Sequence, residues 1–249
     1  MLKADVARKF FDLVVVEARA LDLMSDEHFT VDGTLLEACA GLKSFKNKDD
    51  VEAAPPDDPG NPTVDFHGEK RSNETHQSTT DPDALLARKG AGKEAKLSYC
   101  GNVLMENRNG LPVAGRATEA NTGAEWKAAE EMLSSLTPTG KRRTVGADAG
   151  FDYPVFVNAA RALGVTPHVA LHPHRSPAID GRTTRHPGYE ISLGKRKRIE
   201  QIFGWLKTTA VLRKVRHRGR ELVQWVFVFA LAAYNLVRIR NLSQLPSAG

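Results

Sequence analysis

The chain has 249 residues, of which 41% are hydrophobic and 26% are charged. This balance is ordinary for a globular protein, because a disordered chain would be less apolar and a membrane protein would carry fewer charges. The two cysteines, Cys39 and Cys100, stand in no Cys-x-x-Cys pattern. They therefore indicate neither a disulfide framework nor a structural zinc site, and a reducing cytoplasm is the expected compartment.

The net charge of +5 conceals an uneven distribution of charge along the chain. Residues 182–220 contain twelve lysines and arginines but only two acids, a net charge of +10, so the rest of the chain carries −5. Such asymmetry points to a polyanionic partner for the basic segment. The alternative is a solvated basic helix without a partner.

The predicted elements begin with an amphipathic helix over residues 2–24, a short β-prone run over residues 28–31 and a second helix over residues 35–45. Between residues 49 and 83, ten acids and five prolines accompany only two basic residues. Such a segment lacks the apolar surface to offset the entropy of ordering, so we expect residues 46–94 to form a loop or disordered insert. Its negative charge should keep it away from a polyanion.

From about residue 95 onward, strands and helices alternate. Two strands joined at Asn109-Gly110 predict a hairpin. The elements after it are a helix over 125–136, a strand over 143–147, a helix over 153–163, a strand over 166–171, a loop over 173–189, and helices over 195–208 and 221–239. This order predicts a mixed sheet with helices on its faces.

The last predicted helix raises the question of a membrane span. Residues 222–239 are mostly apolar and nearly long enough to cross a bilayer. Gln224, Asn235 and Arg238 interrupt the apolar run, and membrane spans tolerate few central polar groups. We therefore expect a buried core helix and no membrane partner.

Three acids stand where catalytic groups gather in mixed sheets. Asp32 follows the first β-prone run, Asp148 follows the predicted 143–147 strand, and Glu200 lies inside the basic helix. Carboxylates from two strands and a helix could hold two divalent ions about 4 Å apart, and their oxygen ligands suit Mg²⁺ or Mn²⁺. The structural alternatives are that Asp32 caps a helix or shapes a turn and that Glu200 pairs with Arg196.

Around these acids the sequence resembles the DDE transposases of bacterial insertion sequences. The similar segments include HFTVDGTLLEA, TVGADAGFD, DGRTTRHPGYEISLGKRKRIEQIFGWLKT and AAYNLVRIRNL, and the resemblance extends from about residue 27 to the end. It implies an α/β fold, an RNase H-like mixed β-sheet flanked by helices, with the acidic segment as a disordered insert. It also implies a catalytic domain over residues 27–242, with residues 1–26 as the remnant of a longer helical region.

The resemblance further implies that Asp32, Asp148 and Glu200 form a catalytic triad that holds two Mg²⁺ or Mn²⁺ ions. The enzyme would cleave the ends of an insertion sequence and join them to other DNA. Its partners would be terminal inverted repeats, target DNA and a second copy in a homodimer, in the bacterial cytoplasm at the nucleoid. Two alternatives stay open: a transposase remnant that binds DNA without catalysis, and a related nuclease that cuts without joining.

Basic residues around Glu200 are candidates for DNA binding. Arg196 and Lys207 match the basic positions of the family's Tyr-Arg-Glu-Lys signature. The tyrosine position holds Leu193, and the nearest tyrosine is Tyr189, whose role stays open. The residues that we expect to bind the DNA backbone are Arg196, Lys197, Lys207, Arg213, Lys214, Arg216 and Arg218.

Two further features near the second acid have competing interpretations. His168, His172 and His174 fall at even spacing, so a zinc site is conceivable, but a phosphate-contacting loop or plain surface is favoured because no cysteine or acid lies nearby. Asp152 also matches the transposase pattern, and we expect it to shape the turn rather than to bind metal.

Overall fold

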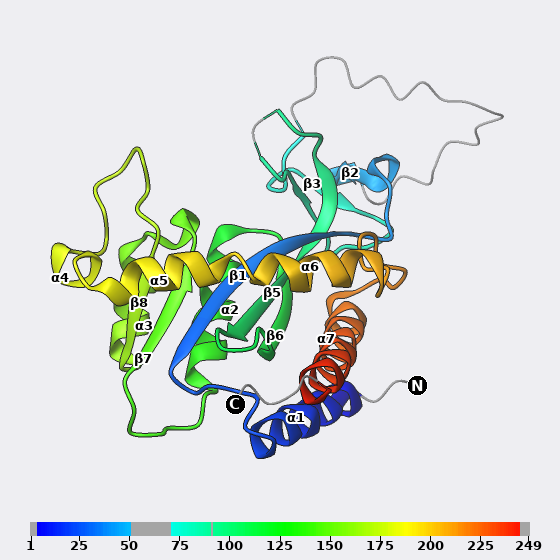
Figure 1. Cartoon of the computed structure of the whole chain (residues 1–249). Helices are drawn as coiled ribbons and strands as arrows, with labels where there is room; N and C mark the ends of the chain where they lie inside the picture. Colours follow the sequence, from blue (N-terminus) through cyan, green and yellow to red (C-terminus); the bar gives the residue numbers. More distant parts are fainter. Residues whose placement is uncertain (1–3, 51–70, 91, 245–249) are drawn as a thin grey trace.

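The computed structural model of the chain describes residues 4–50, 71–90 and 92–244. Figure 1 shows how the elements are arranged. The strands are β1 (His28–Glu37), β2 (Phe45–Asn47), β3 (His76–Ser78), β4 (Leu85–Ala87), β5 (Lys96–Glu106), β6 (Pro112–Glu119), β7 (Arg143–Ala147) and β8 (Val165–Val169). The α-helices are α1 (Ala4–Ala20), α2 (Thr122–Ser134), α3 (Pro154–Ala162), α4 (Gly181–Thr184), α5 (Pro187–Arg196), α6 (Ile199–Thr208) and α7 (Arg220–Ser243), and the 3₁₀ turns are η1 (Leu42–Ser44), η2 (Lys48–Asp50) and η3 (Ala149–Phe151).

Within the described residues, six strands form one mixed sheet. At its centre β1 pairs antiparallel with β5 on one side and parallel with β7 on the other. β8 continues in parallel beside β7, whereas β4 and β6 both pair antiparallel with β5. The antiparallel meander β1–β5–β6 followed by two parallel strands is the arrangement of an RNase H-like sheet, so the predicted fold class is confirmed.

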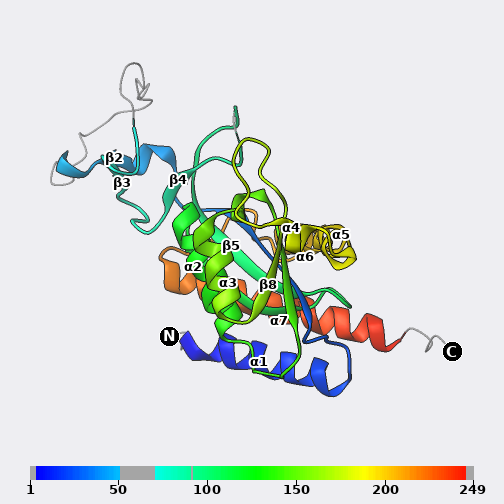
Figure 2. The same cartoon turned by 90° about the vertical axis from the view of Figure 1, so that its left-hand side faces the viewer.

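Helices cover both faces of this sheet. Figure 2 shows α2 and α3 on one side, with α5 and α6 on the other. The period-2 alternation of a strand divides the buried side chains between two apolar clusters. Leu104 of β5 packs in the cluster that includes α2 and α3, whereas its neighbours Val103 and Met105 pack in the cluster that includes α6, α7 and α1.

The hairpin predicted at Asn109-Gly110 joins β5 to β6, as expected. Gly110 has a φ of +75°, a left-handed conformation that glycine adopts without strain. The carboxylate of Glu106, which is fully buried at the end of β5, holds the turn together. It accepts hydrogen bonds from the backbone N–H groups of Ser25, Arg108, Asn109 and Leu111.

The helix expected over residues 35–45 is wrong. β1 continues to Glu37, because its pairing with β5 runs unbroken through Leu36 opposite Tyr99. Leu36 is fully buried in the sheet, and this burial outweighs the helical preference of the local sequence. Only the short turn η1 is helical in this part of the chain.

The segment expected as a loop over residues 46–94 is partly ordered. β2 and β3 pair into a small two-stranded sheet, and β4 joins the main sheet beside β5. Asn73 binds the outer edge of β4: its side chain donates to the carbonyl oxygen of Leu86 at 3.0 Å and accepts from the Leu86 amide at 2.8 Å. The disorder expected in this insert concerns residues 51–70, which lie outside the described residues.

The basic helix expected over residues 195–208 is divided in two. α5 ends at Arg196 and α6 begins at Ile199, and a tight turn with i to i+3 bonding joins them. In that turn the amide of Arg198 donates to the carbonyl of Lys195 at 3.0 Å. The loop expected before this region is also partly helical, since it contains α4 and the first turn of α5.

By length and composition alone, α7 could cross a membrane, with a mean hydropathy of 1.7 in its most apolar window. Half of that window is buried inside the protein. α7 packs against α1, β6 and α6, and the Asn235 side chain donates to the carbonyl oxygen of Pro112 at 2.9 Å. These contacts agree with the expected core helix.

Candidate active site

Asp32 and Asp148 lie level with each other on neighbouring strands. β1 and β7 are parallel, with Thr30 opposite Gly146. Asp32 comes two residues after Thr30, and Asp148 comes two residues after Gly146, directly beyond the end of β7. The parallel register therefore brings the two aspartates to one place at the edge of the sheet.

One oxygen of each aspartate is held by the backbone. The amide of Gly33 donates to Oδ1 of Asp32 at 2.8 Å, and the amide of Gly150 donates to Oδ1 of Asp148 at 2.8 Å. Asp148 thereby caps the short turn η3 as well as facing Asp32. Within the described residues the second oxygen of each carboxylate accepts no hydrogen bond and is available to a ligand.

Glu125, in the first turn of α2, brings a third carboxylate to this place. A Cβ atom built on Gly33 would lie 2.3 Å from Glu125 Oε1, so the carboxylate sits against the backbone beside Asp32. Burial and the charges of Asp148 and Asp32 raise the pKa of Glu125 to about 7. The sequence offered only an acid in a first helical turn, which is common because the helix dipole favours it there, and so Glu125 was missed.

Glu200 is the most exposed of the three predicted acids and lies in the first turn of α6. Burial raises the pKa of Asp32 to about 6, and the charge of Asp148 adds to this effect. Nη1 of Arg196 lies 3.9 Å from Oδ2 of Asp32 and opposes the rise, whereas Glu200 contributes a further small increase. The charges of both other predicted triad acids therefore act on the pKa of Asp32.

A pocket of about 490 Å³ opens beside these acids, and we call it the carboxylate pocket. Its lining includes Gly33, Thr34, Arg88, Lys89, Glu125 and Asp148. Among the described residues, no group of three or more His, Cys, Asp and Glu side chains is close enough to hold a metal ion as it stands. The donor chemistry nevertheless fits divalent cations, because hard carboxylate oxygens with excess negative charge converge here and a cation would relieve their repulsion.

Two of the predicted DNA-binding residues approach the strand that carries Asp32. Besides the approach of Arg196 to Asp32, Nζ of Lys207 donates to Oγ1 of Thr34 at 2.6 Å. Burial, together with the positive charges of Lys89 and Arg213, lowers the pKa of Lys207. The acids of the pocket thus have cationic neighbours, although the helix that was expected to align them is broken.

The loop between α6 and α7, residues 209–219, is attached to the end of β1, and we call it the basic loop. The amide of Glu37 donates to the carbonyl of Arg213 at 3.1 Å, and the amide of Val215 donates to the carbonyl of Glu37 at 2.8 Å. Nζ of Lys214 also lies 3.2 Å from Oε1 of Glu37. The predicted DNA-binding residues whose side chains are exposed are Lys197, Arg213, Lys214, Arg216 and Arg218.

Acids of the ordered part of the insert hold the far end of the basic loop. Oδ1 of Asp81 accepts hydrogen bonds from the Tyr99 hydroxyl at 2.6 Å and from the Gly219 amide at 3.1 Å. Oδ2 of Asp83 accepts from the Arg220 amide at 2.9 Å. The insert is therefore in contact with the basic segment, an arrangement that the sequence did not suggest.

The three histidines do not gather into a metal site within the described residues. His168 is buried on β8, with Nδ1 2.7 Å from Oγ of Ser192. His172 and His174 lie beyond the end of β8, where the amide of His174 donates to Nδ1 of His172 at 3.2 Å. The contacts of His168 are those of a buried strand residue, and the contact between His172 and His174 is that of a turn.

Tyr189 and Asp152 both have structural contacts. The hydroxyl of Tyr189, which is buried, donates to the carbonyl of Val169 at 2.8 Å. Asp152 accepts hydrogen bonds from the amides of His172 at 2.9 Å and Ala178 at 2.8 Å. Its side chain therefore organises the loop after β8, whereas the turn after Asp148 was the expected place of its action.

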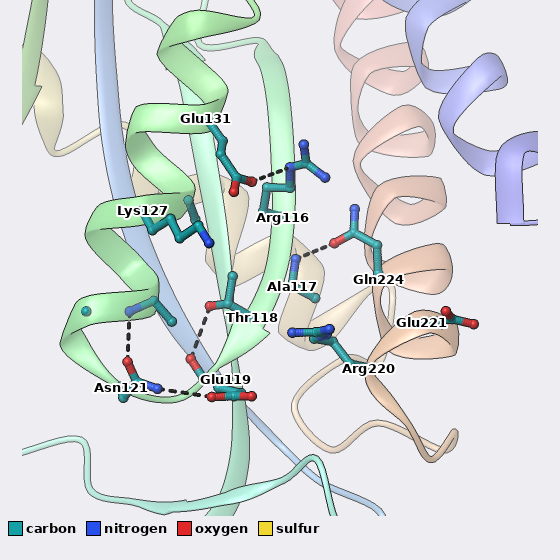
Figure 3. Close-up of a pocket in the computed structure, with 13 residues that line it drawn as sticks. Arg116, Ala117, Thr118, Glu119, Asn121, Lys127, Glu131, Arg220, Glu221 and Gln224 are labelled. Carbon is teal, nitrogen blue, oxygen red and sulfur yellow. Dashed lines mark hydrogen bonds and ion pairs between the residues drawn. The ribbon is translucent and has the colours of Figure 1, made fainter. Parts of the chain in front are cut away.

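A second hollow, of about 550 Å³, lies between β6, α2 and α7. Figure 3 shows Arg116 of β6 directed toward Glu131 of α2, and the two form an ion pair at 3.6 Å. The lining contains equal numbers of basic residues and acids: Arg116, Lys127 and Arg220, and Glu119, Glu131 and Glu221. None of the three predicted acids and none of the predicted DNA-binding residues lines this hollow.

The comparison with protein families identifies the chain. The family described as "Transposase DDE domain" matches residues 24–236. The chain belongs to this transposase family. The family assignment agrees with the resemblance found around the three predicted acids. Among curated proteins, none matches the chain.

Solved transposase structures are also similar to this transposase domain. They include a piggyBac transposase synaptic complex with hairpin DNA, with a TM-score of 0.42, 9% identity, and coverage of 97% of this chain and 61% of that one. A Mos1 transposase paired-end complex with the left transposon end has a TM-score of 0.28 and 10% identity over 96% of this chain and 61% of that one. The chain thus spans less than two thirds of the length of these proteins.

Proposed function

We propose that this transposase domain cleaves the DNA ends of a transposable element of the insertion-sequence type and joins them to target DNA. The proposal is supported chiefly by the meeting of Asp32 and Asp148 on neighbouring strands, within electrostatic reach of Glu200. Acids that can hold divalent ions beside basic side chains that can hold phosphates are the requirements of metal-assisted phosphoryl transfer.

Asp32, Asp148 and Glu200 would hold two Mg²⁺ or Mn²⁺ ions. When bound, such ions supply an activated oxygen nucleophile and stabilise the charge that develops at the scissile phosphate. One oxygen of Asp32 and one of Asp148 are fixed by backbone amides, so both carboxylates are oriented before a ligand arrives. Glu125 adds negative charge between them from α2.

The basic residues would hold the DNA strand over these acids. Lys207 is positioned by Thr34, and Arg196 approaches Asp32, so both would contact phosphates close to the reacting bond. The exposed side chains around the basic loop would contact the backbone further along. The proposed DNA-binding residues are Arg196, Lys197, Lys207, Arg213, Lys214, Arg216 and Arg218.

The test uses the purified chain, labelled duplexes carrying the element's terminal repeats, and Mg²⁺ or Mn²⁺. Nicked and joined strands resolved on a denaturing gel are the expected products. Asp148→Asn and Glu200→Gln should abolish both products and retain DNA binding, because each change removes one negative charge without altering the shape of the side chain. Full activity in either variant contradicts the proposed roles.

A second candidate function is DNA binding without catalysis, as in a transposase remnant. The exposure of Glu200 favours it, because an exposed ligand loses more side-chain freedom on binding an ion. Salt-sensitive DNA binding without any product, in either metal, would support this candidate. A nuclease that cuts but does not join is distinguished by nicked strands without joined ones.

The proposal extends to the partners and to the organisation of the chain. The catalytic unit would cover residues 27–242. It would act as a homodimer on terminal inverted repeats and target DNA, in the bacterial cytoplasm at the nucleoid. Sedimentation of the chain with and without repeat DNA measures the assembly state.

A further inference from the structure

The acidic insert presents two cations to the carboxylate pocket. Arg88 and Lys89 follow directly after β4, and both line the pocket together with Glu125 and Asp148. They come from the far side of the central strand pair, because β4 lies beyond β5 whereas β7, which leads to Asp148, lies beyond β1. The lining of the pocket therefore contains two cations as well as two acids.

These two cations are placed by a rigid support. β4 pairs with β5 through Leu86 opposite Leu97 and Ala87 opposite Lys96. Its other edge is held by both bonds from the Asn73 side chain. β4 is the neighbour of β5 in the main sheet. The residue after Ala87 thus leaves a strand that is fixed on both edges.

The side chains of Arg88 and Lys89 are exposed, and within the described residues neither has an ion pair or a side-chain hydrogen bond. Lys89 also acts electrostatically on Lys207, as does Arg213. Lys89, Lys207 and Arg213 come from three elements that are distant in the sequence, and they gather positive charge beside the pocket. Neither Arg88 nor Lys89 is paired with the acids that line it. An anionic ligand would relieve this repulsion.

We propose that Arg88 and Lys89 bind the phosphate backbone of the DNA strand that enters the carboxylate pocket. The inference rests on the proposed function, and it assigns a DNA-contacting role to a segment whose composition suggested avoidance of DNA. A strand lying across the pocket would meet Arg88 and Lys89 on one flank and Lys207 on the other, with the reacting phosphate over the acids between them.

The test is the salt dependence of binding to a mixed-sequence labelled duplex, without divalent ions so that binding is separate from turnover. Replacing both residues in Arg88→Ala/Lys89→Ala should lower the slope of log affinity against log salt by about 1.8, at about 0.9 for each lost phosphate contact. The matched control is Lys93→Ala/Arg240→Ala, which removes the same charge from exposed residues outside the pocket. It should keep the wild-type slope, as should the charge-preserving exchange Arg88→Lys/Lys89→Arg.

The outcomes separate this inference from the function on which it rests. If the wild-type chain binds and cleaves DNA but Arg88→Ala/Lys89→Ala keeps the wild-type slope, the inference is overturned and the proposed function stands. A slope that falls equally in the control pair also overturns it, because the effect would then be one of net charge. A wild-type chain that binds no DNA overturns both.

Discussion

Two acids on the paired strands β5 and β1 have opposite surroundings. Glu106, at the end of β5, is fully buried, and four backbone N–H groups satisfy its carboxylate. Asp32, on the neighbouring strand, receives one backbone N–H group and faces the charges of Asp148 and Glu200. The Glu106 side chain is fully buried and the Asp32 side chain is 18% exposed, so burial distinguishes the two acids only weakly. The number of hydrogen-bond donors distinguishes them clearly, and it separates an acid that stabilises the fold from acids to which the proposed function assigns cation binding.

The largest expected effect is the loss of activity when the charge of Asp32 is removed. Asp32→Asn should reduce DNA cleavage at least about 1000-fold, equivalent to about 4 kcal/mol of transition-state stabilisation, because a charged ligand is lost. The free energy of unfolding should stay level or rise, since the repulsion from Asp148 disappears. Single-turnover cleavage and urea denaturation measure the two quantities. If the variant is inactive because it is unfolded, Asp32 stabilises the fold as Glu106 does, and the distinction between the two acids is wrong.

Glu106→Ala should have the reverse effect. It leaves buried amides of the β5–β6 turn without an acceptor, so we expect a loss of about 3 kcal/mol in the free energy of unfolding. Cleavage per folded molecule should remain near the wild-type rate. Urea denaturation and active-site titration at low temperature check both. Large losses of activity in molecules that are shown to be folded would place Glu106 among the functional acids.

The pH dependence of stability sharpens the same comparison. The pKa of Asp32 rises from 3.8 to about 6 and that of Glu125 from 4.5 to about 7, so the folded state holds these protons more tightly than the unfolded state. Their contribution to stability is fully present below about pH 4 and is lost as the pH rises through the folded pKa values of about 6 and about 7, by about 3 kcal/mol for Asp32. Asp32→Asn/Glu125→Gln should flatten this part of the profile relative to wild type. Mg²⁺ should restore stability mainly above pH 6, where the carboxylates are ionised.

Unfolding midpoints measured across this pH range, with and without Mg²⁺, decide the point. Other acids of the chain also titrate, and the informative quantity is therefore the difference between the wild-type and double-variant curves. Parallel curves would mean that neither burial nor the neighbouring acids raise the pKa of these two carboxylates in the folded chain.

The smallest expected effect comes from crowding the pocket. In Gly33→Ala the new Cβ atom would meet Glu125 Oε1 at 2.3 Å, as well as the side chains of Cys100 and Asn102 within 3 Å. Displacement of Glu125 should slow cleavage about tenfold, or about 1.4 kcal/mol, and leave DNA binding unchanged. Gly41→Ala is the matched control, because nothing lies within 4 Å of its Cβ position. Equal rates in both variants would show that the position of Glu125 is unimportant.

Local patterns were sufficient to predict much of the sheet. The strand over residues 143–147 coincides with β7, because a short apolar run that ends in Asp148 and a Gly turn has few alternatives. The hairpin at Asn109-Gly110 follows from turn chemistry that depends on neighbouring residues alone. The error over residues 35–45 arose where pairing with a strand some sixty residues away overrides local preference, and no local pattern reports such pairing.

The site was predictable only where its residues belong to recognisable segments. Asp32 and Asp148 follow strands, and parallel register brings strand ends together. Glu125 and Arg88 lie in segments without such signals: the first is an ordinary first-turn acid, and the second lies in an insert dominated by acids and prolines. Where α2 and β4 dock on the sheet depends on tertiary packing, which spacing in the sequence does not express.

The strand β1 links the candidate active site to the basic loop that we propose binds DNA. β1 carries Asp32 and, five residues later, Glu37, to which the basic loop is bonded. At about 3.4 Å per residue, the two points lie about 17 Å apart. For a DNA strand running along β1, this separation corresponds to about five phosphates. Under the proposed function, the length of DNA held beyond the cut would thus be set by an extended strand of the central sheet, and it should vary little from one target to the next.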